Sequence, residues 1–207
     1  MRVLVMLAGV AVLFAASPLA AQDARRARAT ELASLGVRFA EAGDRVSGRA
    51  YLRDAITADP SYAEAYVELG ELELARASFH DAEATFRVGL VRAQPDVRLW
   101  IGLARSLVAL GADDDAEAVL AQADAQLHDD PALLAFRAER AEARGRWSVA
   151  LALARRMASA ARSRGETERA SELEARARAL AVLVGSLDPV RGYDRGTSSI
   201  RSALADR

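Results

Sequence analysis

The residues that could do chemistry in this chain are few, and their spacing suits no common reaction. The two histidines, His80 and His128, lie far apart, and neither has a second histidine, a cysteine or a carboxylate at the spacing of a metal site. We therefore expect both histidines at the surface or in turns. The acidic run 113–115 lacks the alternating oxygen ligands, the glycine and the distant glutamate of a calcium-binding loop. Aspartates that cap a helix N-terminus explain this run better.

Nucleophiles and phosphate-binding motifs are also missing from the sequence. The chain has no cysteine, which excludes disulfides, cysteine catalysis and thiolate metal sites. It contains no serine elbow, no phosphate-binding glycine loop and no zinc-binding helix motif. Its net charge of −1 gives no basic excess to neutralise phosphates, so nucleic-acid binding is not expected. We predict a protein without enzymatic activity and without a cofactor or metal.

The N-terminal segment has the pattern of an export signal. Residues 3–16 form an unbroken run of apolar and small residues behind Arg2. The run is shorter than the about 20 residues of a transmembrane helix, and small residues follow it up to Ala21. We predict a signal peptide over residues 1–21, cleaved before Gln22, and hence a periplasmic or secreted bacterial protein. The alternative is an uncleaved segment that anchors the chain in the inner membrane; the missing cysteine excludes a lipoprotein anchor.

A spacing of 34 residues recurs along the rest of the chain. An aromatic residue or leucine, a second leucine and a small residue repeat in this register: Leu32, Tyr66, Trp100 and Leu134; Leu35, Leu69 and Leu103; Gly36, Gly70 and Ala104. Later in each unit, small residues recur at Gly48, Ala82, Ala116 and Ala150, and large apolar residues at Leu52, Phe86 and Leu120. Internal periodicity of this length is typical of repeat architectures. The spacing divides the chain into four units without insertions, 29–62, 63–96, 97–130 and 131–164.

This pattern resembles that of the tetratricopeptide-repeat family. The resemblance implies two antiparallel helices in each unit and an all-α solenoid, in agreement with a composition rich in alanine, leucine, glutamate and arginine. We expect Gly43, Gly111 and Gly145 to end first helices in the left-handed conformation. Pro60 and Pro95 should end second helices. The fourth unit matches least well.

The segments that flank the four units have different predicted roles. Residues 22–28 are expected to form a linker. Residues 165–187 have apolar side chains at helical spacing and a charged opposite face, and we predict a C-terminal capping helix there. Residues 188–207 are rich in glycine, serine and arginine, and we expect a disordered tail.

In tetratricopeptide arrays the first helices of successive units line a concave groove, so the resemblance implies a binding surface. The residues in that register are Val37, Glu64, Val67, Glu68, Glu71, Arg98, Ile101, Arg105, Phe136, Glu139 and Glu142. Two interpretations of the charged residues stay open: they contact a ligand, or they only keep the array soluble and pair with one another. The family's Lys-and-Asn clamp for C-terminal carboxylates is absent at the matching positions. Arg98 and Arg105 could still hold a carboxylate.

The leading functional hypothesis is an exported tetratricopeptide-repeat scaffold that mediates protein–protein interaction in the bacterial cell envelope. Its ligand would be a protein or peptide in the concave groove. The mature chain would have no stable membrane span and would be a monomer or a weak oligomer. The alternative is a structural subunit or assembly factor of an envelope complex that acts through its outer face and the C-terminal tail.

Overall fold

The computed structural model describes residues 18–187. Most of the predicted signal peptide, residues 1–17, and the predicted tail, residues 188–207, lie outside the described residues.

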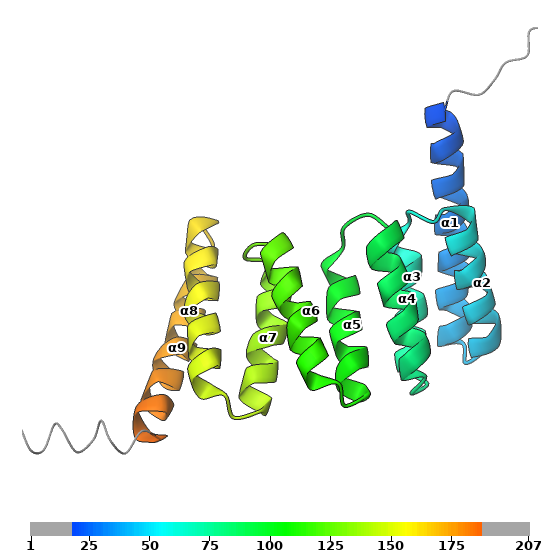
Figure 1. Ribbon diagram of the computed structural model, residues 1–207. Coiled ribbons are helices and arrows are strands. Elements are labelled where there is room, and N and C mark those ends of the chain that lie inside the picture. Colours follow the sequence, from blue (N-terminus) through cyan, green and yellow to red (C-terminus); the bar gives the residue numbers. More distant parts are fainter. Residues whose placement is uncertain (1–17, 188–207) are drawn as a thin grey trace, which may run out of the picture.

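Residues 18–187 fold into nine α-helices and contain no strand (Figure 1). The first eight helices form four consecutive pairs, and the ninth packs against the eighth. The predicted all-α solenoid with an additional C-terminal helix is confirmed. In chain order the helices are α1 (Pro18–Glu41), α2 (Arg45–Ala58), α3 (Ala63–Leu74), α4 (Phe79–Arg92), α5 (Val97–Ala109), α6 (Asp113–Gln126), α7 (Pro131–Ala143), α8 (Trp147–Ser163) and α9 (Thr167–Leu187).

The first helix begins earlier than predicted. Residues 22–28, expected to be a linker, lie inside α1. This segment holds alanines and arginines with no glycine or proline, so nothing in it ends a helix. Arg26 fixes the segment to the end of the first unit, because its Nε lies 2.6 Å from Oδ2 of the buried Asp59 and its guanidinium lies over the ring of Tyr62.

The turns within the pairs follow the predicted glycine pattern, with one exception. Gly43, Gly111 and Gly145 have φ of 90°, 76° and 67°, which confirms their left-handed conformation. In the second unit the equivalent residue is Ala77, which has φ of 57°. The second unit therefore makes the same turn with a residue that disfavours it.

The acidic run 113–115 does not cap a helix in the predicted way. Ala112 is the N-cap residue of α6 and makes no side-chain capping bond, while the three aspartates occupy the first turn. Asp113 is the first residue of α6 and so lies one position after the N-cap. Carboxylates in the first turn still interact favourably with the helix dipole.

The core changes in character along the array. Between α3 and α5 the ring of Phe86 lies against two glycines: an added Cβ would lie 2.4 Å from it at Gly70 and 2.3 Å from it at Gly102. Those glycines let the helices close around a fully buried aromatic ring. The cluster formed by α7, α8 and α9 is instead built mainly from alanines and leucines.

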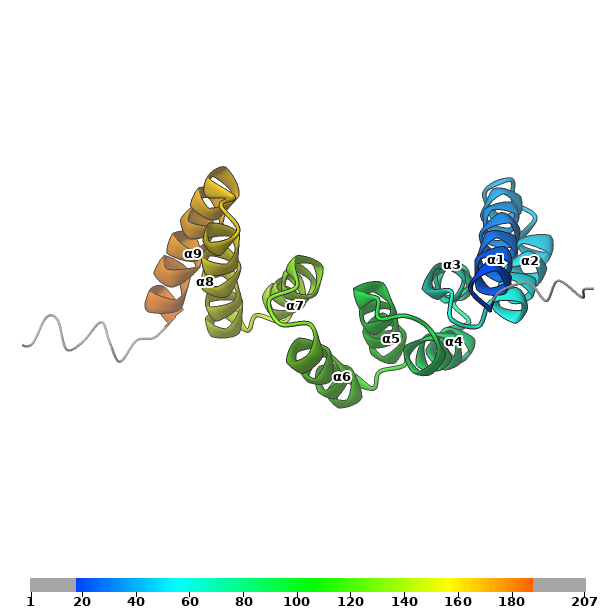
Figure 2. The same ribbon diagram turned by 90° about the horizontal axis from the view of Figure 1, so that it is seen from above.

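The helices follow a curved path with α3, α5 and α7 on its inner side and α4 and α6 on its outer side (Figure 2). At the C-terminal end, α9 buries Ala170, Leu173, Ala177 and Leu180 against the preceding pair. Its opposite face carries exposed charged residues, as the capping hypothesis requires.

Candidate protein-binding groove

The predicted groove residues lie mainly on α3, α5 and α7, and most of them are accessible. Arg98, Arg105 and Glu139 are exposed; Val37, Glu64, Glu68, Glu71, Ile101, Phe136 and Glu142 are partly buried. Val67 is different, because it is 5% exposed and belongs to the core cluster around Phe86. Helices α1, α2, α4 and α5 all pack against α3. Val67 is therefore a core residue and presents no side chain to a ligand.

Charged side chains pair between successive first helices, always between an acid and an arginine 34 residues later. Arg98 Nη2 lies 2.5 Å from Glu64 Oε2, and its Nη1 lies 3.1 Å from Oε1, which makes the contact bidentate. Arg105 Nη1 lies 2.6 Å from Glu71 Oε1. These two arginines are thus occupied by acids of the same groove.

Arg98 also joins the end of its own helix to this network. Its Nη2 lies 2.7 Å from Oδ2 of Asp96, the N-cap residue of α5. Burial opposes ionisation of Asp96, but hydrogen bonds from the Arg98 side chain and backbone outweigh it and lower the pKa of the carboxyl. Hydrogen bonds to Asp96 and Glu64 raise the pKa of Arg98. The guanidinium is therefore held in place by two carboxylates.

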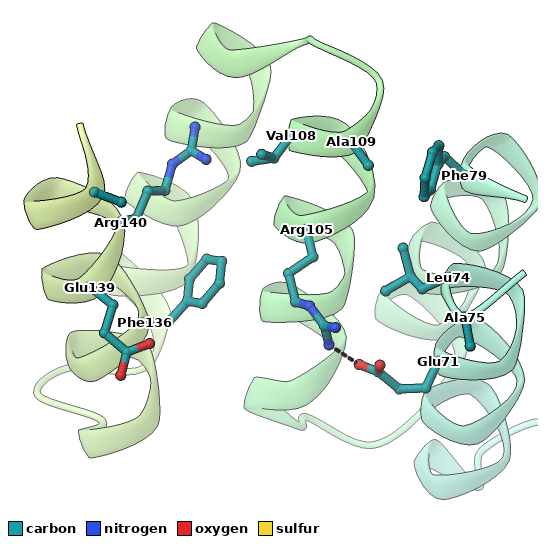
Figure 3. A pocket seen from close by; sticks show the side chains of 11 residues that line it. Glu71, Leu74, Ala75, Phe79, Arg105, Val108, Ala109, Phe136, Glu139 and Arg140 are labelled. Carbon is teal, nitrogen blue, oxygen red and sulfur yellow. Dashed lines mark hydrogen bonds and ion pairs between the residues drawn. The ribbon is translucent and has the colours of Figure 1, made fainter. Parts of the chain in front are cut away.

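Two groove acids have no such partner. Within the described part of the chain, neither Glu68 nor Glu139 forms an ion pair. Burial and the neighbouring Glu64 raise the pKa of Glu68. Glu71, Arg105 and Glu139 follow one another at intervals of 34 residues, so Arg105 could pair with either acid. Its guanidinium points toward Glu71 on α3 and leaves Glu139 without this partner (Figure 3).

A pocket of about 570 Å³ opens between the C-terminal halves of α3, α5 and α7 (Figure 3). Its apolar wall combines two aromatic rings with aliphatic side chains, and four charged residues stand among them. The lining residues are Glu71, Leu74, Ala75, Phe79, Arg105, Val108, Ala109, Phe136, Glu139, Arg140 and Ala143. The volume lies within the about 300–1,000 Å³ typical of ligand pockets.

The pocket exists because one register position changes size. Phe136 lies 34 residues after Gly102, so α7 carries a phenyl ring where α5 carries no side chain. The buried residue at the equivalent position of the second helices becomes smaller instead, from Phe86 on α4 to Leu120 on α6. A helix that carries Phe136 cannot approach as closely as one that carries glycine, and α7 packs less extensively on α5 and α6 than α5 does on α3 and α4. The half-buried ring of Phe136 lines the resulting space.

Ion pairs hold α7 and α8 to α6, where the third and fourth units meet behind the pocket. Arg140, whose side chain is 8% exposed, places Nη2 2.7 Å from Asp113 Oδ1 and Nε 3.0 Å from Glu117 Oε1. Asp124 Oδ2 accepts hydrogen bonds from Arg137 at 2.6 Å and Arg156 at 2.7 Å. Arg140 therefore links the pocket wall to the outer helix.

These contacts lower the pKa values of all three acids. The hydrogen bond from Arg140 lowers the pKa of Asp113, and the hydrogen bond from Arg156 lowers the pKa of Asp124. Burial opposes ionisation of Glu117, but hydrogen bonds from Arg146 and Arg140 outweigh it and lower its pKa. All three acids are stabilised as carboxylates by the fold.

Other chemically reactive groups do not gather elsewhere in residues 18–187. No group of three or more histidine, cysteine, aspartate or glutamate residues with metal-binding geometry occurs in this part. His80 and His128 are exposed, and His80 Nδ1 lies 3.7 Å from Glu83 Oε2. Among the described helices, none is long and apolar enough to cross a membrane.

The sequence hypothesis identifies part of this pocket and misses the rest. Glu71, Arg105, Phe136 and Glu139 are predicted groove residues and line it. The lining residues that the sequence does not predict are Leu74, Ala75, Phe79, Val108, Ala109, Arg140 and Ala143. They lie near the C-terminal ends of the first helices, or at the start of α4, beyond the register positions considered. The change from Gly102 to Phe136 is the available signal.

Comparisons with known proteins identify the fold. No protein-family model matches the sequence, and no curated protein matches it. Among solved structures, PilW, described as a widely conserved type IV pilus biogenesis factor, has a TM-score of 0.51 at 16% identity over 78% of this chain and 83% of PilW. PilF of Pseudomonas aeruginosa has a TM-score of 0.50 at 16% identity over 90% and 99% of the two chains. TTC0263, a tetratricopeptide-repeat protein of Thermus thermophilus, has a TM-score of 0.50 at 17% identity over 83% and 98%.

Proposed function

We propose that this chain, whose fold is that of tetratricopeptide-repeat proteins, is an exported scaffold that binds a protein or peptide segment in its concave groove in the bacterial cell envelope. The observation that carries the binding role is the open apolar pocket between α3, α5 and α7. Extended concave surfaces of solenoids are commonly used for binding. The described residues offer no competing constellation with catalytic geometry, so the proposed role is non-catalytic.

The envelope location rests on the N-terminal sequence. Arg2, the apolar run over 3–16 and the small residues before Gln22 form a signal-peptide pattern. PilW, whose fold this chain shares, is a type IV pilus biogenesis factor, and an envelope role for this chain is compatible with that description. N-terminal sequencing of the mature protein should begin at Gln22. A mature chain that still begins at Met1 would refute cleavage and favour the anchored alternative.

A pair of matched variants tests the groove. Val108 lines the pocket and is 36% exposed, and Val91 is 85% exposed on α4. Val108→Glu should place a charge in the apolar pocket and abolish recovery of partners cross-linked to the tagged full-length chain in its own cells. Val91→Glu should leave that recovery unchanged, with circular dichroism showing that both variants fold.

The alternative function gives the opposite result. If the partner acts on the outer face or the tail, Val108→Glu keeps the partner, and deletion of residues 188–207 or Val91→Glu releases it. Turnover of a substrate by the purified protein alone would contradict both binding proposals.

A further inference from the structure

The groove contains more acids than arginines that lack an ion pair within residues 18–187. Glu64 and Glu71 are occupied by Arg98 and Arg105 on α5. At the far end of the groove, Glu142 Oε1 lies 2.9 Å from Nη2 of Arg176 on α9. The groove charges left without an ion pair in the described chain are therefore acids, Glu68 and Glu139.

These two acids differ in what they could offer a ligand. Glu68 is half-buried beside Glu64, and its raised pKa reflects burial first and then the repulsion of that neighbour. Glu139 is exposed and lines the apolar pocket, one helical turn after Phe136 on α7. In Figure 3 the Phe136 ring and the Glu139 carboxylate project from neighbouring positions of α7, while Arg105 points to Glu71 on the opposite side.

An acidic ligand would meet a less favourable surface. It would need to displace Glu64 from a bidentate contact with Arg98, or Glu71 from a 2.6 Å contact with Arg105. Arg140 is committed to Asp113 and Glu117 and has a side chain only 8% exposed. The suggestion from sequence that Arg98 and Arg105 hold a ligand carboxylate is thus disfavoured by their existing partners.

We propose that the groove binds a basic segment of a partner protein, with one large apolar side chain seated in the pocket and a lysine or arginine beside Glu139. This inference rests on the proposed function and specifies its ligand class. Phe79, Val108 and Phe136 supply the apolar contact, and burial of a large side chain supplies most of the affinity. Charge complementarity at Glu139 selects the neighbouring residue and rejects acidic segments.

Selection from a display library of random peptides tests the ligand class even while the partner is unidentified. The immobilised protein should enrich peptides that contain Phe, Trp, Leu or Ile with Lys or Arg within a few residues. Glu139→Arg should weaken a synthetic copy of the most enriched peptide by about tenfold, because repulsion replaces an attractive pair. The same variant should select peptides with Asp or Glu in place of the basic residue.

A matched control separates the local charge from net charge. Asp54 on α2 is also exposed and forms no ion pair in the described chain, so Asp54→Arg changes the net charge equally. It should leave peptide affinity and selected sequences unchanged. Enrichment of acidic or uncharged peptides by the unmodified protein, no enrichment at all, or equal effects of the two variants would each overturn the inference.

The outcomes also distinguish this inference from the proposed function. If Val108→Glu abolishes peptide binding but Glu139→Arg leaves the selected sequences unchanged, the groove is the binding site and the ligand class is wrong. If Val108→Glu leaves peptide binding unchanged, the groove proposal itself fails, and the ligand class fails with it.

Discussion

At the scale of single residues, Ala77 is the clearest departure from the repeat pattern. The residues at this position in the other three units are glycines with positive φ, and Ala77 has φ of 57°. A left-handed alanine costs about 1 kcal/mol that glycine avoids. We expect Ala77→Gly to raise the free energy of unfolding by up to about 1 kcal/mol, as measured by urea denaturation followed by circular dichroism.

The control for this prediction is a glycine in a helix interior. Ala121 is exposed within α6, and Ala121→Gly should destabilise by about 1 kcal/mol. Opposite signs for the two substitutions support the strained turn, and destabilisation by both contradicts it.

Glu73 is the most deeply buried acid described, with an exposure of 2%. Its Oε1 lies 3.2 Å from Arg49 Nη2, and its Oε2 accepts a hydrogen bond from Thr85 Oγ1 at 2.7 Å. Without Glu73, the partly buried Arg49 keeps only Asp81, 3.1 Å from its Nη2, and the Thr85 hydroxyl loses its acceptor. We therefore expect Glu73→Ala to destabilise the protein by about 3 kcal/mol in thermal or urea unfolding.

A surface pair provides the comparison for Glu73. Arg28 Nη1 lies 3.0 Å from Glu31 Oε2, and both side chains are at least 60% exposed. Glu31→Ala should change stability by less than about 1 kcal/mol. Similar losses for Glu73→Ala and Glu31→Ala would show that burial adds nothing to the first pair.

At the scale of helices, the contact of α3, α4 and α5 depends on complementary sizes. An added Cβ on Gly102 would lie 2.3 Å from the Phe86 ring, so the ring or the helix must move. We expect Gly102→Ala to destabilise the protein by about 1–3 kcal/mol. Phe86→Leu should relieve the clash, because the next junction has Leu120 at the equivalent position.

A double-mutant cycle in urea unfolding measures this coupling. The double variant Gly102→Ala with Phe86→Leu should lose less stability than the sum of the two single losses. Additive losses would mean that the two residues do not share one packing constraint.

The helices themselves could be predicted because each unit must bury the same face. A constant interval of 34 residues places a leucine or aromatic residue and a small residue at the same contacts, and Gly111 and Gly145 mark the turns. The start of α1 could not be read from this pattern, because the repeat register begins after it. Local helix propensity over 22–28 was the better guide there.

The site was less predictable than the helices, because it depends on distances between them. The repeat register places Val67 on a first helix, but it does not reveal that neighbouring helices cover the side chain. The register also identifies Phe136 without showing how far its ring separates α7 from α5. Pairing of Arg98 with Glu64 could be expected from the acid–base order, and this pair forms. The same order does not show that Glu68 and Glu139 stay without an ion pair in the described chain.

At the scale of the whole molecule, the third and fourth units meet at a junction rich in charge. The apolar contact there includes Leu120, Ala123 and Leu133, and Phe136 packs at its margin. Ion pairs add to this contact: Asp113, Glu117 and Asp124 of α6 pair with arginines of α7, of α8 and of its N-cap position. The width of the pocket thus depends on interactions that salt and protons weaken.

The pH dependence of this junction follows from the lowered pKa values of its three acids. An acid whose pKa is lower in the folded state stabilises the fold above its unfolded pKa, and this contribution is lost as the pH falls through the folded value. Because unperturbed aspartate and glutamate titrate near about pH 4, the junction should be intact at neutral pH and weaken below about pH 4.

Fluorescence energy transfer can measure loosening of the junction between the third and fourth units. The chain has no cysteine, so labels attach only to the cysteines that are introduced. Val91 on α4 and Val182 on α9 are 85% and 73% exposed and lie on opposite sides of the junction. Between low salt and about 1 M salt, where the Debye length falls to about 3 Å, transfer between Val91→Cys and Val182→Cys should shift to a broader distance distribution.

Two comparisons assign that change to the junction. Val46 on α2 is 79% exposed, and labels at Val46→Cys and Val91→Cys lie on one side of the junction. They should report a smaller change in high salt, because the Arg49–Glu73 pair between these units is largely buried and is screened less. Asp124→Asn keeps the shape of the side chain but removes the charge shared by Arg137 and Arg156. It should reproduce at low salt part of the broadening seen at high salt. A distribution across the junction that is insensitive to both salt and Asp124→Asn would mean that the apolar contact around Leu133 alone fixes the fourth unit, and that the groove is rigid.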